Sequence, residues 1–160
     1  MSIISRTAQY ALRSMTLLAI QHDRVTVKDL AQEVGAPQPY LARIIMLLAD
    51  KGLVDARRGP GGGLRLARPA EEIRLIDIVS LFDGSKLFEE CALGLPGCRE
   101  GEHPCPIHDQ WGCIREQIRT WWHDTTLAQF KPEQTLECMR ERVKHLPVET
   151  PYSRGNGRWR

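Results

Sequence analysis

The chain has no apolar run approaching the ~20 residues needed to span a membrane. Its first six residues also lack the basic start and apolar core of a signal peptide, so we expect the protein to stay in the cytoplasm. The 160 residues are 42% hydrophobic and 26% charged, as in a globular protein. This length suits one compact core with an appendage, or two small units.

Acidic residues are scarce in the first part of the chain. Residues 1–70 carry ten Lys/Arg against five Asp/Glu, a net charge of +5, whereas residues 71–160 carry twelve against fifteen, a net charge of −3. This asymmetry favours a nucleic-acid-facing module joined to a second, different unit.

No acidic residue lies between Arg57 and Arg68, a stretch with four arginines around a glycine and proline tip at 59–63. The tip prevents a continuing helix, and the apolar runs on either side predict a β-hairpin. A flexible cationic hairpin can lie along a phosphate backbone and reach into a groove. A solvated surface hairpin is the competing interpretation. A phosphate-cradling nucleotide loop is excluded, because the glycines are not followed by Lys-Ser/Thr and a helix.

Three helices are expected before the hairpin. The capping residues Ser5 and Thr26, the helix-ending glycines Gly35 and Gly52, and helical spacing of apolar residues predict them at about 5–21, 27–34 and 37–51. The order of helix, short helix, tight turn, helix and basic hairpin is that of a winged helix-turn-helix. The predicted fold class is therefore mainly α with a small β-wing.

In such a fold the third helix lies in the major groove and the hairpin flanks it. The candidate DNA-binding residues near the start of the third helix are Gln38, Tyr40 and Arg43, with core packing as the alternative for Tyr40. Those on the hairpin are Arg57, Arg58, Gly59, Gly61 and Arg65.

Apolar periodicity returns after the hairpin. It predicts helices at about 73–82, 109–130 and 132–145, with an aperiodic loop between the first two. The 109–130 helix, with its large aromatic residues, is best explained as a dimerisation element, and an ordinary packing helix is the alternative. We divide the chain into a winged helix-turn-helix domain at 1–84, a cysteine-rich loop at 85–108, dimerisation and C-terminal helices at 109–146, and a disordered tail at 147–160.

Cys91, Cys98 and Cys105 are the candidate metal ligands of the loop, each separated from the next by six residues. Zinc sites usually contain a close Cys-x-x-Cys pair, which is missing here. Three evenly spaced thiolates suit three corners of an iron–sulfur cluster, with zinc and reduced redox-sensing thiols as alternatives. His108 is the nearest candidate for a fourth ligand. The other candidates nearby are Glu90, Glu102, His103, Asp109 and Cys113.

Several motifs together resemble the Rrf2 family of bacterial winged-helix repressors, which includes IscR, NsrR, RirA and CymR. They are the Ser-Arg-x-x-x-Tyr-Ala start, Pro-Tyr-Leu in the third helix, Lys-Gly-Leu-Val, Arg-Gly-Pro-Gly-Gly-Gly, and the three-cysteine loop before a long helix. The resemblance covers roughly residues 2–130. It implies a homodimer with crossed long helices, in which each protomer brings a winged helix to one half-site of a palindromic operator.

The resemblance also implies that the three cysteines hold an iron–sulfur cluster. Cys-Pro-Ile-His places His108 where IscR-type members have their histidine ligand. NsrR-type members use an aspartate near the N-terminus of the other subunit, and residues 6–10 contain no acid here. The cysteine intervals of six and six depart from the family's usual five and five or seven and five. Ala42 stands where IscR-type recognition helices have a glutamate.

The sequence therefore predicts a homodimeric DNA-binding transcription repressor controlled by an iron–sulfur cluster, with 2Fe–2S favoured over 4Fe–4S. Its signal would be iron, cluster status, redox state or nitric oxide. The alternative is a zinc-bound or apo regulator whose reduced cysteines sense redox state. An enzyme is disfavoured, because nothing resembles a substrate pocket and no acid is placed to orient His108 beside Cys105.

Overall fold

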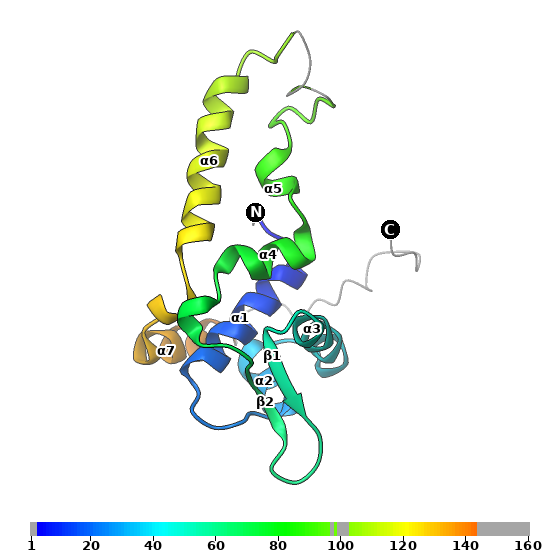
Figure 1. Cartoon of the computed structure of the whole chain (residues 1–160), viewed down its shortest axis with the longest axis vertical. Helices are drawn as coiled ribbons and strands as arrows, with labels where there is room; N and C mark the ends of the chain where they lie inside the picture. The colour runs from blue at the N-terminus through cyan, green and yellow to red at the C-terminus, as the bar shows by residue number, and fades with distance from the viewer. Residues whose placement is uncertain (1–2, 97, 99–102, 144–160) are drawn as a thin grey trace.

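The computed structural model describes residues 3–96, 98 and 103–143, and the fold is mainly helical with one two-stranded antiparallel sheet. The elements are α1 (Arg6–Ile20), α2 (Val27–Val34), α3 (Gln38–Asp50), β1 (Val54–Arg57), β2 (Gly63–Leu66), η1 (Ala70–Glu72), α4 (Leu75–Asp83), α5 (Lys86–Glu89), α6 (His108–Asp124), η2 (Leu127–Gln129) and α7 (Pro132–Val143). Figure 1 shows the first helices gathered into one body, the hairpin projecting from it, and α6 extending away from it. The predicted fold class is confirmed.

The first three helices begin and end where their capping residues predicted. The Ser5 hydroxyl accepts a hydrogen bond from the Ala8 backbone N–H, and Thr26 does the same for Asp29. Gly35 ends α2 with φ 70°, a left-handed conformation that glycine adopts without strain. The three helices pack around a common apolar core, in which side chains such as Leu41 are fully buried.

The predicted hairpin is the β1–β2 pair. Its register places Val54 opposite Leu66 and Asp55 opposite Arg65. Val25, between α1 and α2, bridges to Leu64 through two backbone hydrogen bonds of 3.0 and 2.8 Å. The wing is therefore attached to the helical body through the segment that precedes α2.

The long helix is shorter than the sequence predicted, because α6 ends at Asp124 rather than near residue 130. The Thr125 carbonyl accepts the Leu75 N–H at 2.9 Å, and the Leu127 N–H donates to the Ile73 carbonyl at 3.0 Å. The Leu127 side chain is 1% exposed and lies in the core. Backbone pairing with the start of α4 thus replaces the helical hydrogen bonds that continuation of α6 would need.

Two further segments complete the described chain. The loop after α4, predicted to be aperiodic, contains the short helix α5. The last helix, α7, returns to pack on α1 and α2, with Arg140 3.5 Å from Glu33. Residues 144–160, including the predicted tail, lie outside the described residues. Among the helices that the structure describes, none combines the length and apolarity of a membrane-crossing segment.

Candidate metal centre and nucleic-acid interface

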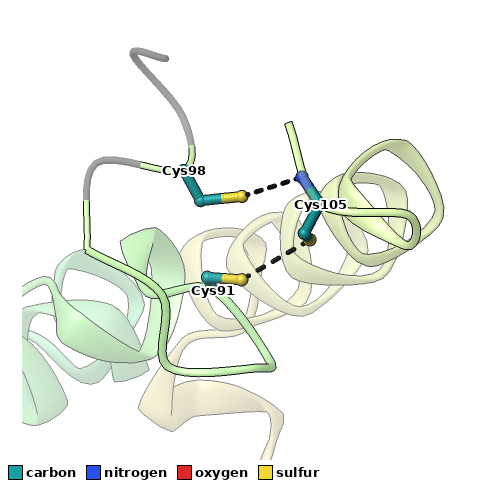
Figure 2. Close-up of side chains that lie close together, drawn as sticks. All are labelled: Cys91, Cys98 and Cys105. Carbon is teal, nitrogen blue, oxygen red and sulfur yellow. Dashed lines mark hydrogen bonds between the residues drawn. The ribbon is translucent and has the colours of Figure 1, made fainter. Parts of the chain in front are cut away.

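The three predicted cysteine ligands come together at the N-terminal end of α6. Cys91 follows α5, Cys98 lies in the intervening loop, and Cys105 lies just before α6. The three sulfur atoms all lie within 4.8 Å of one another. Figure 2 shows the Cys91 and Cys98 side chains directed toward Cys105 from separate stretches of the loop. Residues fourteen positions apart along the chain therefore share one site.

The donor atoms form two close pairs. Cys91 Sγ lies 3.6 Å from Cys105 Sγ, and Cys98 Sγ lies 3.4 Å from His108 Nδ1. His108 is the first residue of α6, and its N–H donates to the Cys105 carbonyl at 2.9 Å. This turn at the helix start brings the imidazole, the predicted fourth ligand, beside Cys98.

The thiols of the two outer cysteines have opposite tendencies to ionise. Backbone hydrogen bonds from Leu93 and Leu95 lower the pKa of Cys91 to about 7. Burial raises the pKa of Cys105, and the neighbouring Cys98 side chain raises it further. Binding a metal here would release protons, because the ligand form of a cysteine is the thiolate.

The donor set fits a sulfur-binding metal group. Two sulfurs held by one tetrahedral metal at ~2.3 Å lie ~3.8 Å apart, close to the 3.6 Å between Cys91 and Cys105. Thiolate and imidazole are ligands of both zinc and iron–sulfur clusters. The pocket beside these residues measures about 510 Å³. Cys113 and Asp109 are exposed on α6 and His103 is exposed in the loop, and none of them joins the group of three sulfurs. His108 is also outside this group, and among the described residues its contact with a cysteine sulfur is the one with Cys98.

Two side chains of α6 hold the chain that leads into Cys91, and sequence analysis did not identify them. Trp111 Nε1 donates to the Glu90 carbonyl at 2.9 Å, and Arg115 donates to the Glu89 carbonyl at 2.5 Å. Their spacing of four residues places both on one face of the helix, which was the available signal. The cysteine loop and α6 are therefore joined by hydrogen bonds as well as by the proposed ligands.

The candidate residues of the third helix divide into two groups. Gln38 and Arg43 are exposed on α3. Tyr40 is half-buried, its hydroxyl forms a hydrogen bond with the Thr7 hydroxyl, and its ring meets that of Tyr10 edge-on at 6.0 Å. The position of Tyr40 thus matches the packing alternative, since it ties α3 to α1.

The candidate wing residues are all exposed: Arg57, Arg58, Gly59, Gly61 and Arg65. The tip turns back through Gly59 and Gly61, whose φ values of 90° and 73° are left-handed. Asp55, which sequence analysis left out, lies among these arginines at 3.0 Å from Arg65 Nε.

The outer face of α6 carries exposed apolar side chains. Trp121 is 56% exposed and Ile114 46%, seven residues apart and so on one side of the helix. Trp121 also lines part of a shallow hollow of about 1090 Å³ along α6, whereas Ile114 does not contribute to its lining. Its neighbour Trp122 faces the core and is 7% exposed. Large apolar side chains left in water on one face are typical of an interaction surface.

The fold and these surfaces define a winged-helix regulator. The sequence matches the Rrf2 family, described as an iron-dependent transcriptional regulator, over residues 4–133. The chain belongs to this family. Family members and structural neighbours are DNA-binding transcription regulators rather than enzymes, and this chain is classed with them.

Individual relatives agree with this assignment. A protein of Aquifex aeolicus (strain VF5), named as an HTH-type transcriptional regulator, is 35% identical over 127 residues, covering 78% of this chain and 88% of that protein. IscR of Serratia proteamaculans (strain 568) is 29% identical over 141 residues, covering 87% and 85%. The structure of CymR, the global cysteine regulator of B. subtilis, matches with a TM-score of 0.64 at 28% identity, covering 80% of this chain and 95% of that one.

Proposed function

We propose that this protein is a homodimeric, cytoplasmic transcription repressor that binds a palindromic DNA operator under the control of an iron–sulfur cluster. The observation that carries the proposal is the meeting of three cysteine sulfurs within 4.8 Å of one another. This site lies at one end of α6, while the winged helix lies at the other. The proposal includes a winged helix-turn-helix domain at 1–84, a cysteine-rich loop at 85–108, dimerisation and C-terminal helices at 109–146, and a tail at 147–160.

The proposed cluster is of the 2Fe–2S type, held by Cys91, Cys98, Cys105 and His108. The number of donors supports this type, because such a cluster takes two protein ligands on each iron, and the three sulfurs with the neighbouring imidazole supply four. Kinship with IscR-named regulators supports it as well. When bound, the group would supply redox chemistry and sensitivity to iron supply, oxidants or nitric oxide.

Contacts within this chain would couple the conformation of the cysteine loop to the position of the DNA-binding winged helix. Trp111 and Arg115 join the loop to α6, and the far end of α6 is joined to α4 through Thr125 and Leu75. Ordering the loop would therefore fix α6 and, with it, the distance between two winged helices in a dimer. Linkage requires the converse, so operator DNA must raise the equilibrium affinity of the protein for the metal group.

The proposed dimer forms through α6. The exposed side chains of Trp121 and Ile114 support this role, because a symmetric partner helix would remove both from water. Gln38, Arg43 and the wing arginines would then contact the DNA at each half-site, with Arg or Gln reading base edges and the wing binding phosphates.

The first test is anaerobic purification followed by measurement of iron, sulfide and visible absorption. The wild type should contain about two irons and two sulfides per chain. Cys98→Ala should lose both together with the colour. Cys138→Ala is the matched control, because Cys138 is an exposed cysteine on α7, outside the sulfur group, and should keep them. A colourless wild type with zinc, or with no metal, would contradict the cluster.

A second candidate is a thiol sensor without iron. The 3.6 Å between Cys91 and Cys105 sulfurs favours it, because little movement would bring them to bonding distance. Hydrogen peroxide would take two electrons and two protons from the thiols, giving one disulfide and two waters. The solved structures similar to this chain include an oxidized form of Staphylococcus aureus CymR, which is consistent with such chemistry. Peptide mapping after peroxide treatment should find a Cys91–Cys105 crosslink, and intact thiols would contradict this candidate.

A further inference from the structure

The two faces of the wing differ sharply in chemistry. Val54 and Leu64 lie on one face and are each 3% exposed. Asp55, Arg57 and Arg65 share the opposite face, because side chains alternate along a strand and Asp55 pairs with Arg65 in the register. A single carboxylate therefore stands among the arginines of a hairpin that projects from the helical body (Figure 1).

One carboxylate oxygen of Asp55 faces the Nε atoms of both wing arginines, Arg57 and Arg65. Asp55 Oδ2 accepts a hydrogen bond from Arg65 Nε at 3.0 Å and forms an ion pair with Arg57, whose Nε lies 3.5 Å away. An arginine held by Nε keeps its two terminal Nη groups on the outer edge of the guanidinium. Within the part of the chain that the structure describes, neither arginine makes a further hydrogen bond or ion pair, and they are 63% and 56% exposed. Four Nη groups thus remain available on the outer side of the wing.

A third arginine holds the carboxylate from behind. Arg24 Nη2 lies 2.5 Å from Asp55 Oδ2, and its Nη1 donates to the backbone carbonyls of Asp55 and Gly63 at 3.1 and 2.9 Å. Arg24 is only 14% exposed, whereas the two wing arginines are open to solvent. It therefore fixes Asp55 to the base of the hairpin and offsets its charge, leaving this group of four side chains with a net charge of +2.

We propose that Asp55 is a positioning residue of the DNA-binding wing, which holds Arg57 and Arg65 by Nε so that their Nη edges face DNA phosphates. This inference rests on the proposed DNA-binding function. Without the carboxylate, the two long side chains are ordered only when DNA binds. The entropy lost at that moment weakens the complex. Arg24 is essential to the arrangement, because it keeps Asp55 from moving outward with the arginines.

A purely electrostatic role for Asp55 predicts the opposite sign. Removing a negative charge close to phosphates strengthens their attraction to the wing, so the affinity would rise. Positioning predicts that the affinity falls even though the net charge becomes more positive. The direction of the change therefore separates the two roles.

The experiment measures binding of a fluorescent duplex, selected by the wild type from random sequence, over a range of salt concentrations. Asp55→Ala should bind about threefold to tenfold more weakly than the wild type. Its salt slope should be unchanged, because mobile arginines still reach the phosphates. Arg65→Ala should instead flatten the slope by about 0.9 for each phosphate that the variant no longer neutralises. The matched control is Glu71→Ala, which removes an exposed carboxylate away from the arginine group and should bind no more weakly than the wild type.

The free protein provides an independent measurement. In NMR spectra the Arg65 Nε–H signal should be protected from exchange in the wild type and lose this protection in Asp55→Asn. Asp55→Asn keeps the shape of the side chain and replaces Asp55→Ala in the binding experiment if the alanine variant fails to fold. Equal or tighter DNA binding by both Asp55 variants, or unchanged Nε–H protection, would overturn the inference. A wild type that selects no duplex would instead refute the proposed DNA-binding function itself.

Discussion

Replacing Trp121 with alanine should dissociate the proposed dimer. The residue is 56% exposed, so about 110 Å² of a side chain of about 200 Å² faces water. A symmetric dimer would bury two copies, or about 220 Å², which amounts to about 5 kcal/mol at 25 cal/mol per Å². An alanine at position 121 would still bury part of this area in the dimer. We therefore assign about half of the free energy, 2–3 kcal/mol, to the substitution. The dimer dissociation constant should then rise about 30-fold to 150-fold.

Sedimentation equilibrium over a dilution series measures this constant. Met46→Ala is the control: Met46 is 66% exposed but lies on α3, so its removal should leave the constant unchanged. Trp121 also meets the Trp122 ring edge-on at 5.0 Å, so thermal unfolding of each variant must show that the monomer stays folded. A folded Trp121→Ala that dimerises as tightly as the wild type would refute the assignment of this face.

Three further predictions concern other parts of the molecule. Gly35→Ala should lower the free energy of unfolding in urea by about 1–2 kcal/mol from left-handed strain, and further because a Cβ would meet Val143; an unchanged midpoint would contradict this. The pKa of Asp55 is lowered by its arginine partners, so its contribution to stability is present above the ordinary value near 4 and lost as pH falls through the lowered one. Urea unfolding of wild type and Asp55→Asn should therefore converge in acid, and a constant difference would argue against the ion pairs. Trp111→Phe keeps an aromatic side chain but removes the N–H donor to the Glu90 carbonyl, so a chelator should extract metal about tenfold more readily; extraction at the wild-type rate would count against a role for this hydrogen bond.

The helix-turn-helix was predictable because its signals are local. Ser5, Thr26 and Gly35 each act on hydrogen bonds within their own turn, and the apolar spacing of α1–α3 repeats with the helical period. The wing followed from its glycine tip and flanking apolar runs. Such signals do not depend on what the rest of the chain does.

The errors came from interactions between distant segments. The end of α6 is decided by Thr125 and Leu127 pairing with the backbone near Leu75, about fifty positions earlier, and no local residue marks it. The position of Asp55 among the arginines depends on the hairpin register and on Arg24, neither of which follows from the composition of the tip. The meeting of the cysteines was expected from their spacing, whereas the hydrogen bonds of Trp111 and Arg115 to the loop required its path in space.

Backbone hydrogen bonds attach the C-terminal end of α6 to the start of α4, so movement of α6 would be transmitted to the helical body. The helix has 17 residues and is therefore about 25 Å long. Backbone hydrogen bonds fix its lower end, so it cannot swing freely where it meets the helical body. If α6 tilted by about 10° about its N-terminal end, its C-terminal end and the attached winged helix would move by about 4 Å. This is slightly more than the ~3.4 Å rise of one base pair. In the proposed dimer, a tilt of this size would shift each winged helix relative to its DNA half-site.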